Sequence, residues 1–184
     1  MEKYLGNNPG LAKRLEHSQS VGDFACKVAE RVAERNPELG LDAKLIGFLG
    51  YVHDIGYSVS DAKHEVHSVN ILKKEGVEDA VAGKAMHGQL AEQFGETEGN
   101  VAQYLPIGLE GMILTYSDMS VRTGEPVPMV ERAAEIIARI KAVPTMPEQL
   151  KQDIETNMYK ALPRFERYEK IVLALAGVQS AREF

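Results

Sequence analysis

The sequence LIGFLGYVHDIGY, at residues 45–57, decides the fold class because its apolar residues recur at helical spacing. Ile46 and Leu49 lie seven and four residues before His53, so all three side chains share one helix face. An apolar face of this kind is expected to be buried. The stretch therefore predicts a helix whose last turn carries a polar side chain, His53, into the interior.

The rest of the chain repeats this helical spacing, and alternating strand patterns do not extend beyond three or four residues. Glycine and proline residues separate the apolar stretches and set their ends. The helices that this spacing predicts cover approximately residues 21–32, 42–53, 65–74, 78–87, 107–120, 129–141, 148–161 and 164–176.

The segment between residues 88 and 103 is polar, and a surface loop or a frayed helix is expected there. Pro163 is expected to interrupt the chain before the last helix. The prediction is an all-α fold of about seven to nine helices. It forms a single domain over residues 1–184, with core motifs at 15–122 and C-terminal helices at 128–178 packed on them.

The composition limits the kinds of partner. A net charge of −6 disfavours extended nucleic acid, which requires a basic surface, but it allows a small phosphorylated substrate at a local metal site. Cys26 is the single cysteine, so no intrachain disulfide can form and a cytoplasmic location is expected. The opening MEKYLGNNPG is unlike a signal peptide, and no stretch reaches the roughly 18 apolar residues of a membrane span. No membrane partner is expected, and the oligomeric state is left open.

Two further polar side chains extend apolar helix faces in the same way as His53. His17 precedes Val21 by four residues, and Asp118 follows Leu114 by four. A buried charged group without a partner costs roughly several kcal/mol, and a shared cation would remove that cost. Histidine and carboxylate are a natural donor set for a divalent metal. A satisfied core residue or a helix cap is the alternative for each residue alone, but the repeated placement favours one metal site.

The order of these residues resembles that of the HD superfamily of metal-dependent phosphohydrolases. The matching motifs are a histidine that opens a helix in LEHSQSVGDFA, an HDIG-type tetrad in YVHDIGY, further histidines, and an aspartate in LTYSDMSV. The resemblance implies a single HD-domain helical bundle. It also implies one divalent metal ion bound by His17, His53, Asp54 and Asp118.

A second metal ion is implied by the histidines that follow the tetrad. In KHEVHSVNILKKEG, counting back from the Ile-Leu pair favours His64 as the family position, with His67 as the alternative. His87, in KAMHGQ, resembles the further histidine of members that bind two metals. His64 and His87 would then hold a second metal, with Asp54 as the bridge. Alternatively, one or both bind substrate phosphate above a single metal. Mn, Fe, Mg, Co, Ni and Zn are not distinguished.

The resemblance implies hydrolysis of a nucleotide or another small phosphoester by a metal-activated water. Asp54 would position that water, and His64 or His87 would act as general acid or base. A lysine often follows the tetrad in this superfamily, whereas this chain has Tyr57. The candidate phosphate contacts are therefore Lys63, Lys84 and Arg122, although a solvated surface charge is the favoured interpretation of each one alone.

Two other functions are compatible with this fold. One is a non-catalytic ligand-binding or signalling HD module, and the other is a metal-dependent oxygenase. Loss of a ligand would favour the non-catalytic module, but every core ligand is present. An enzyme is therefore the favoured interpretation.

Overall fold

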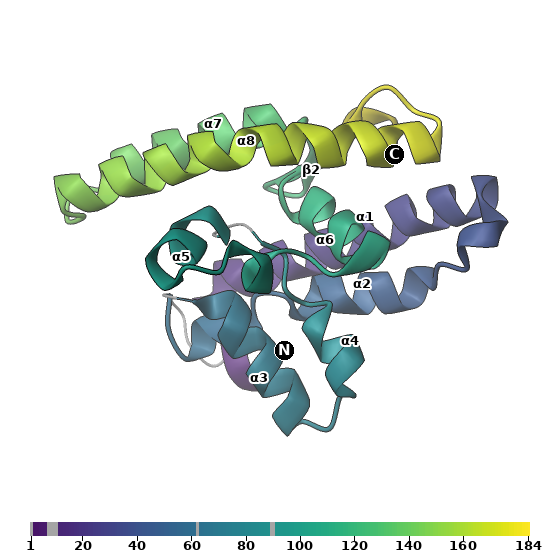
Figure 1. The fold of residues 1–184 in the computed structure, drawn as a ribbon, viewed down its shortest axis with the longest axis horizontal. Coiled ribbons are helices and arrows are strands. Elements are labelled where there is room, and N and C mark those ends of the chain that lie inside the picture. The colour runs from purple at the N-terminus through teal and green to yellow at the C-terminus, as the bar shows by residue number, and fades with distance from the viewer. Residues whose placement is uncertain (1, 7–10, 62, 89–90) are drawn as a thin grey trace.

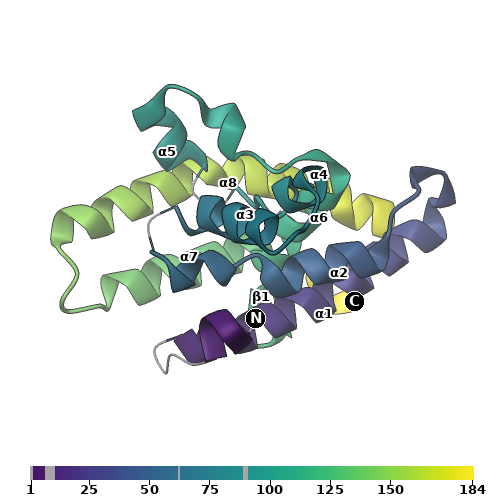
Figure 2. The same cartoon turned by 90° about the horizontal axis from the view of Figure 1, so that it is seen from below.

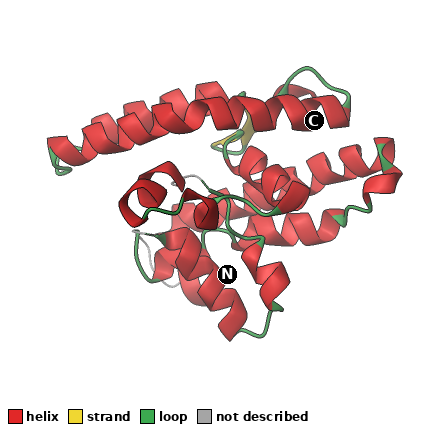
Figure 3. Cartoon of the chain, in the orientation of Figure 1, coloured by secondary structure: helices red, strands yellow, loops and turns green. Residues whose placement is uncertain are grey.

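The computed structural model describes residues 2–6, 11–61, 63–88 and 91–184 of the chain. This part is almost entirely helical (Figure 3). Its eight α-helices are α1 (Ala12–Arg35), α2 (Ala43–Val52), α3 (His64–Lys74), α4 (Asp79–Gly83), α5 (Ala91–Glu98), α6 (Gly108–Asp118), α7 (Met129–Lys141) and α8 (Glu148–Ala176). The all-α prediction is confirmed.

Short helical turns and one small hairpin connect these helices. The turns are Glu2–Gly6, Pro37–Leu39, Ile55–Ser58, Val101–Tyr104 and Ala181–Glu183. The hairpin pairs strand β1 (Val121–Arg122) with β2 (Glu125–Pro126) in antiparallel register. Two-residue strands are too short to produce an alternating pattern, which is why the sequence did not reveal them.

The helices form layers around α6. Helices α1 and α2 pack side by side along much of their length, and α6 contacts both of them (Figures 1 and 2). Helices α7 and α8 form an outer hairpin, whose α8 packs on α1 and α6. In Figure 1, α3 and α4 lie on the opposite side of this arrangement. No helix of the described part has both the length and the apolarity needed to cross a membrane.

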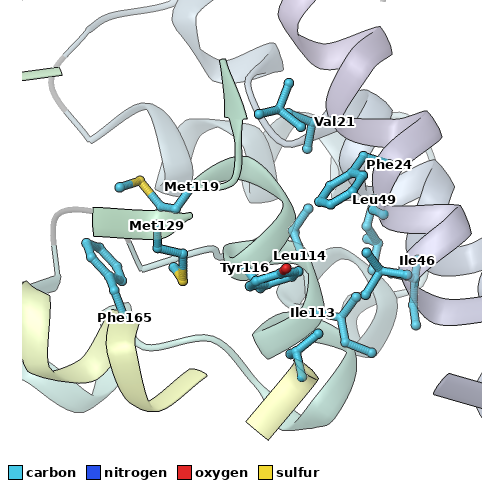
Figure 4. Close-up of a cluster of buried hydrophobic side chains, with 14 of the residues drawn as sticks. Val21, Phe24, Ile46, Leu49, Ile113, Leu114, Tyr116, Met119, Met129 and Phe165 are labelled. Atoms are coloured by element: carbon cyan, nitrogen blue, oxygen red, sulfur yellow. The ribbon is translucent and has the colours of Figure 1, made fainter. Parts of the chain in front are cut away.

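The core joins the N-terminal helices to the C-terminal hairpin. Figure 4 shows buried side chains of this core, which come from five helices and from the position directly after α6: Val21, Phe24, Ile46, Leu49, Ile113, Leu114, Tyr116, Met119, Met129 and Phe165. Ile46 and Leu49 are fully buried, as the spacing in α2 predicted. Asp42 also caps this helix, because its carboxylate accepts a hydrogen bond from the amide of Leu45 at 3.0 Å.

Helix α4 is shorter than the sequence suggested. It was expected to reach His87 but ends at Gly83. The amides of Lys84 and Ala85 bond to carbonyls three residues back, at 3.0 and 3.1 Å, and this tightens the chain into successive turns. His87 therefore lies outside any helix. The polar segment that follows contains α5 and a further turn, whereas residues 89–90 lie outside the described part.

The expected break at Pro163 is wrong, because α8 continues through it. A proline inside a helix costs roughly 3 kcal/mol through one missing hydrogen bond and a steric clash. Here Pro163 is exposed, and Tyr159, whose carbonyl would have accepted that bond, is 56% exposed. Met158 and Phe165 are buried on the same helix, and each contributes roughly 1.5–3 kcal/mol. Burial of the inner face outweighs the local cost.

Candidate metal centre

The ends of several helices bring the predicted polar side chains to one place. The six side chains are His17 on α1, His53 and Asp54 directly after α2, His64 at the start of α3, His87 after α4, and Asp118 at the end of α6. They form three overlapping groups of three, and within each group the possible ligand atoms all lie within 4.8 Å of one another. His53, Asp54 and His87 each belong to two of these groups.

The first half of the cluster is organised around Asp118. Its Oδ1 atom lies 2.9 Å from Nε2 of His17 and 3.5 Å from Nε2 of His53. Nε2 of His53 also lies 3.4 Å from Oδ1 of Asp54. For metal–ligand bonds of roughly 2.0–2.3 Å, neighbouring ligands of one cation are separated by roughly 2.9–3.7 Å. These three distances therefore match the edges of a coordination polyhedron.

The second half of the cluster shares Asp54 with the first. Oδ1 of Asp54 lies 3.6 Å from Nε2 of His64, and this Nε2 lies 3.3 Å from Nε2 of His87. The same carboxylate oxygen therefore faces His53 on one side and His64 on the other. One carboxylate oxygen of Asp54 is thus shared between the two halves of the cluster.

Three of the imidazoles are oriented by backbone carbonyls. Nδ1 of His53 and of His64 faces the carbonyl three residues earlier in the chain, at 2.7 and 3.4 Å. Nδ1 of His87 faces the carbonyl two residues earlier, at 3.2 Å. A carbonyl can only accept, so Nδ1 carries the proton in His53 and His87, whose contacts lie within ordinary hydrogen-bond distance, and a neutral ring then has its lone pair on Nε2. This second contact is the usual support of a metal-binding histidine.

His53 provides the most direct sign of a cationic partner. Its Nε2 is fully buried and has no hydrogen-bond partner among the described residues, because the neighbouring carboxylates lie beyond ordinary hydrogen-bond distance. Burial alone lowers the pKa of His53, but the carboxylates of Asp54 and Asp118 outweigh it and raise the pKa to about 9. This nitrogen therefore faces an environment that attracts a proton or, in its place, a metal ion.

The pKa values of the two aspartates are shifted in the opposite direction, downwards. Burial raises the pKa of Asp54, but His53, His64 and Arg14 outweigh it and lower the pKa to about 2. Burial also raises the pKa of Asp118, yet the hydrogen bond to His17 and the proximity of His53 hold that pKa well below its ordinary value. Both carboxylates are thus ionised at neutral pH, as metal ligands must be.

The glycine of the tetrad allows α3 to pack directly against the metal centre. A Cβ atom on Gly56 would lie 1.9 Å from the carbonyl oxygen of His64 and 2.6 Å from the amide of Ser68. Ser68 joins the two segments, because its hydroxyl donates to the carbonyl of His53 and accepts from the amide of Gly56. The close approach that places His64 beside Asp54 therefore requires glycine at this position.

Three residues at the centre were not selected from the sequence as functional. Arg14 donates from Nη1 to Oδ2 of Asp54 at 3.3 Å, and its guanidinium lies 3.7 Å above the ring of Tyr57. Tyr57 in turn stacks on His64 at 4.0 Å. Glu65 is buried, with Oε1 at 3.6 Å from Nε2 of His87. Two features of the sequence could have identified them. Arg14 lies three residues before His17, on the same helix face, and Glu65 is adjacent to His64.

The other sequence-selected residues have different surroundings. His64 belongs to the cluster, whereas His67 is in none of the groups found among the described residues. Lys63 forms an ion pair with Glu98, and Lys84 forms one with Glu110 at 2.6 Å. Arg122 lies in strand β1, which packs against α1. Phosphate binding by these three cations remains a prediction.

Comparison with known proteins identifies the family. A family model of the HD domain matches residues 14–140, which is more than half of the chain. The chain belongs to the HD domain family. HD domains bind divalent metals and are generally metal-dependent phosphohydrolases. No curated protein and no solved structure shows significant similarity to this chain.

Proposed function

We propose that this HD domain is a metal-dependent phosphohydrolase that acts on a nucleotide or another small phosphoester. The observation that carries the proposal is the convergence of four histidines and two aspartates, from separate helices, in one cluster. The ligand set proposed for the first cation is His17, His53, Asp54 and Asp118, and that for the second is Asp54, His64 and His87. Bound divalent cations would supply Lewis-acid polarisation of a phosphoryl oxygen and would lower the pKa of a water molecule.

Asp54 is proposed as the central residue, because its Oδ1 atom faces both halves of the cluster. Its ionised state is secured by the surrounding positive groups, so it can orient a nucleophilic water as an acceptor. Burial lowers the pKa of His64, and the opposing carboxylate of Asp54 does not restore it. His64 is therefore neutral at pH 7 and can serve either as a ligand or as a general base. His87 is the other candidate for acid–base catalysis.

Arg14 is proposed as a phosphate contact that takes the place of the lysine missing after the tetrad. Its side chain is 37% exposed, although one of its nitrogens reaches Asp54. The Tyr57 ring holds the guanidinium in a cation–π contact, with Cζ 3.7 Å from the ring centroid, and a planar guanidinium can bind phosphate through two nitrogens. Lys63 and Lys84 would have to give up their pairing with carboxylates to make such a contact.

The test combines metal content with a substrate screen. We expect the purified protein to contain a divalent transition metal and to hydrolyse at least one nucleotide or phosphoester when Mn²⁺ is added. Chelation should abolish the activity, and Mn²⁺ should restore it. A protein that binds no divalent cation would overturn the proposal.

The alternative of a non-catalytic HD module predicts a different outcome in the same screen. Such a protein would bind a phosphorylated ligand in the presence of metal but would leave it intact. Ligand binding can be followed by calorimetry on the samples used for the hydrolysis assay. Binding without turnover across the nucleotide and phosphoester panel would replace the enzyme proposal with the module.

A further inference from the structure

His87 is the cluster residue whose position owes least to local helical structure. It lies four residues beyond the end of α4, after the successive turns in which the amides of residues 84–86 bond to carbonyls three residues back. Two side chains from other helices hold its backbone. Thr115 on α6 lies with Oγ1 2.6 Å from the carbonyl oxygen of His87, and Oε2 of Glu65 on α3 accepts from the amide of Gly88 at 2.9 Å. Long-range contacts therefore set where this imidazole lies.

A third contact comes from α8. Nη2 of Arg164 donates to the carbonyl oxygen of Gly88 at 2.6 Å. The same guanidinium binds both carboxylate oxygens of Glu92 on α5, at 2.8 and 2.7 Å. One side chain thus connects the residue that follows His87 to a helix further along the chain.

The surroundings of this contact make it more than a surface ion pair. The side chains of Arg164 and Glu92 are only 14% and 18% exposed. The bidentate geometry fixes the guanidinium plane, and so it also fixes the direction of the bond to Gly88. Gly88 has a φ of +66°, and a Cβ there would lie 2.8 Å from Cδ of Pro106. The peptide after His87 is therefore clamped in a conformation that favours glycine.

We infer that Arg164 is a positioning residue for the metal centre: it holds the Gly88 peptide, and through it the imidazole of His87, within reach of His64 and Asp54. Arg164 lies beyond residue 140, where the match to the HD family ends. The C-terminal helix of this chain thereby takes part in completing the second half of the cluster. The part of this inference that concerns metal binding rests on the proposed function.

The experiment uses the full chain with Arg164→Ala and Arg164→Lys. Alanine removes the contacts with both Gly88 and Glu92. Lysine keeps the charge and can reach either residue, but it cannot bind both carboxylate oxygens of Glu92 and the carbonyl of Gly88 at once. Arg167→Ala is the matched control, because it removes the same charge from an exposed position of the same helix. Circular dichroism checks that each variant keeps its helical content.

The first readout is hydrogen exchange of the segment 84–88 in metal-free protein. We expect faster exchange there in Arg164→Ala, an intermediate rate in Arg164→Lys, and the wild-type rate in Arg167→Ala. This readout needs neither metal nor activity, so it tests the clamp even if the proposed function fails. Unchanged exchange in both Arg164 variants would overturn the inference.

The second readout is a Mn²⁺ binding isotherm. Loss of an outer residue that orients a ligand typically weakens metal binding about 10- to 100-fold. We expect this loss for the equivalent held by His87 and wild-type affinity for the equivalent held by His17 and His53. Equal weakening of both equivalents would mean general destabilisation and would contradict a positioning role. A wild-type protein that binds no Mn²⁺ would instead refute the proposed function.

Discussion

His53 and His87 pack edge to face at the centre, with ring centroids 4.9 Å apart, yet the chain holds them in different ways. His53 follows α2 directly, and its ring bonds to a carbonyl of that same helix. His87 lies outside any helix and depends on contacts from three other helices. A ligand of the first kind follows from helical periodicity, whereas a ligand of the second kind follows only from packing. The two halves of the cluster should therefore respond differently to mutation and to pH.

The largest effect is expected at the carboxylate that the two halves share. Asp54→Asn should abolish binding of both metal equivalents and reduce hydrolysis by about 10³-fold or more, because it removes the charge that organises the site. Circular dichroism should show the helical fold intact. Asp61→Asn, at an exposed position on the same connection, is the control and should behave as wild type. A substantially active Asp54→Asn protein would contradict the proposed site.

The next prediction separates the two halves. His87→Ala should remove one of two Mn²⁺ equivalents and leave the other bound, whereas His53→Ala should weaken the equivalent held by α1 and α2. His67→Ala controls for histidine loss, because His67 lies outside the cluster. Equivalents are counted by calorimetric titration. Saturation of wild type at one equivalent, with full activity, would assign His64 and His87 to substrate binding or acid–base catalysis instead.

The pH dependence of the free energy of unfolding tests the half of the cluster that contains His53, in protein without metal. The pKa of His53 is raised to about 9 from an ordinary value of 6.5. Its stabilising contribution is therefore fully present below pH 6.5 and is lost as pH rises towards 9. The shift corresponds to roughly 3 kcal/mol at the upper limit. Urea unfolding of metal-free protein between pH 6 and 9.5 measures this loss.

The matched variant for the pH experiment is His53→Gln, which should lose less stability over the same range. The difference between the two proteins isolates His53, because the lowered pKa of His64 acts in the opposite direction in both. With metal present the trend should reverse, since the proton on His53 must leave before a cation can bind. Parallel profiles for the two metal-free proteins would refute the assignment.

The smallest effect is expected at the contact between α6 and the His87 segment. Thr115→Val should destabilise the protein by about 1 kcal/mol, because it leaves the carbonyl of His87 without this donor. It should also weaken the second metal equivalent several-fold. Ser117→Ala is the control, since that hydroxyl donates within its own helix, to the carbonyl of Ile113. Denaturant midpoints and Mn²⁺ titration measure both effects. An equal loss of the second equivalent in the control would argue against a specific role of Thr115.

Local spacing was enough to predict most of the helices and the first half of the cluster. The faces that carry His17, His53 and Asp118 are set by a period of about 3.6 residues, which can be read within two turns of helix. The resemblance to the HD superfamily then ordered these residues into one candidate site. These predictions depend on neighbours in sequence, and a helix converts such neighbours reliably into neighbours in space.

The remaining features depend on which surfaces meet, and only the folded chain shows that. The resemblance already favoured His64 over His67, but the contact of α3 with Gly56 that places His64 beside Asp54 appears only in the fold. Burial along α8 outweighs the cost of Pro163 and carries Arg164 to the segment that holds His87. Arg14 gains its contact with Asp54 because α1 and α2 pack side by side. Each of these outcomes is set by contacts between residues that are distant in sequence. A local sequence pattern carries no information about the energies of such contacts.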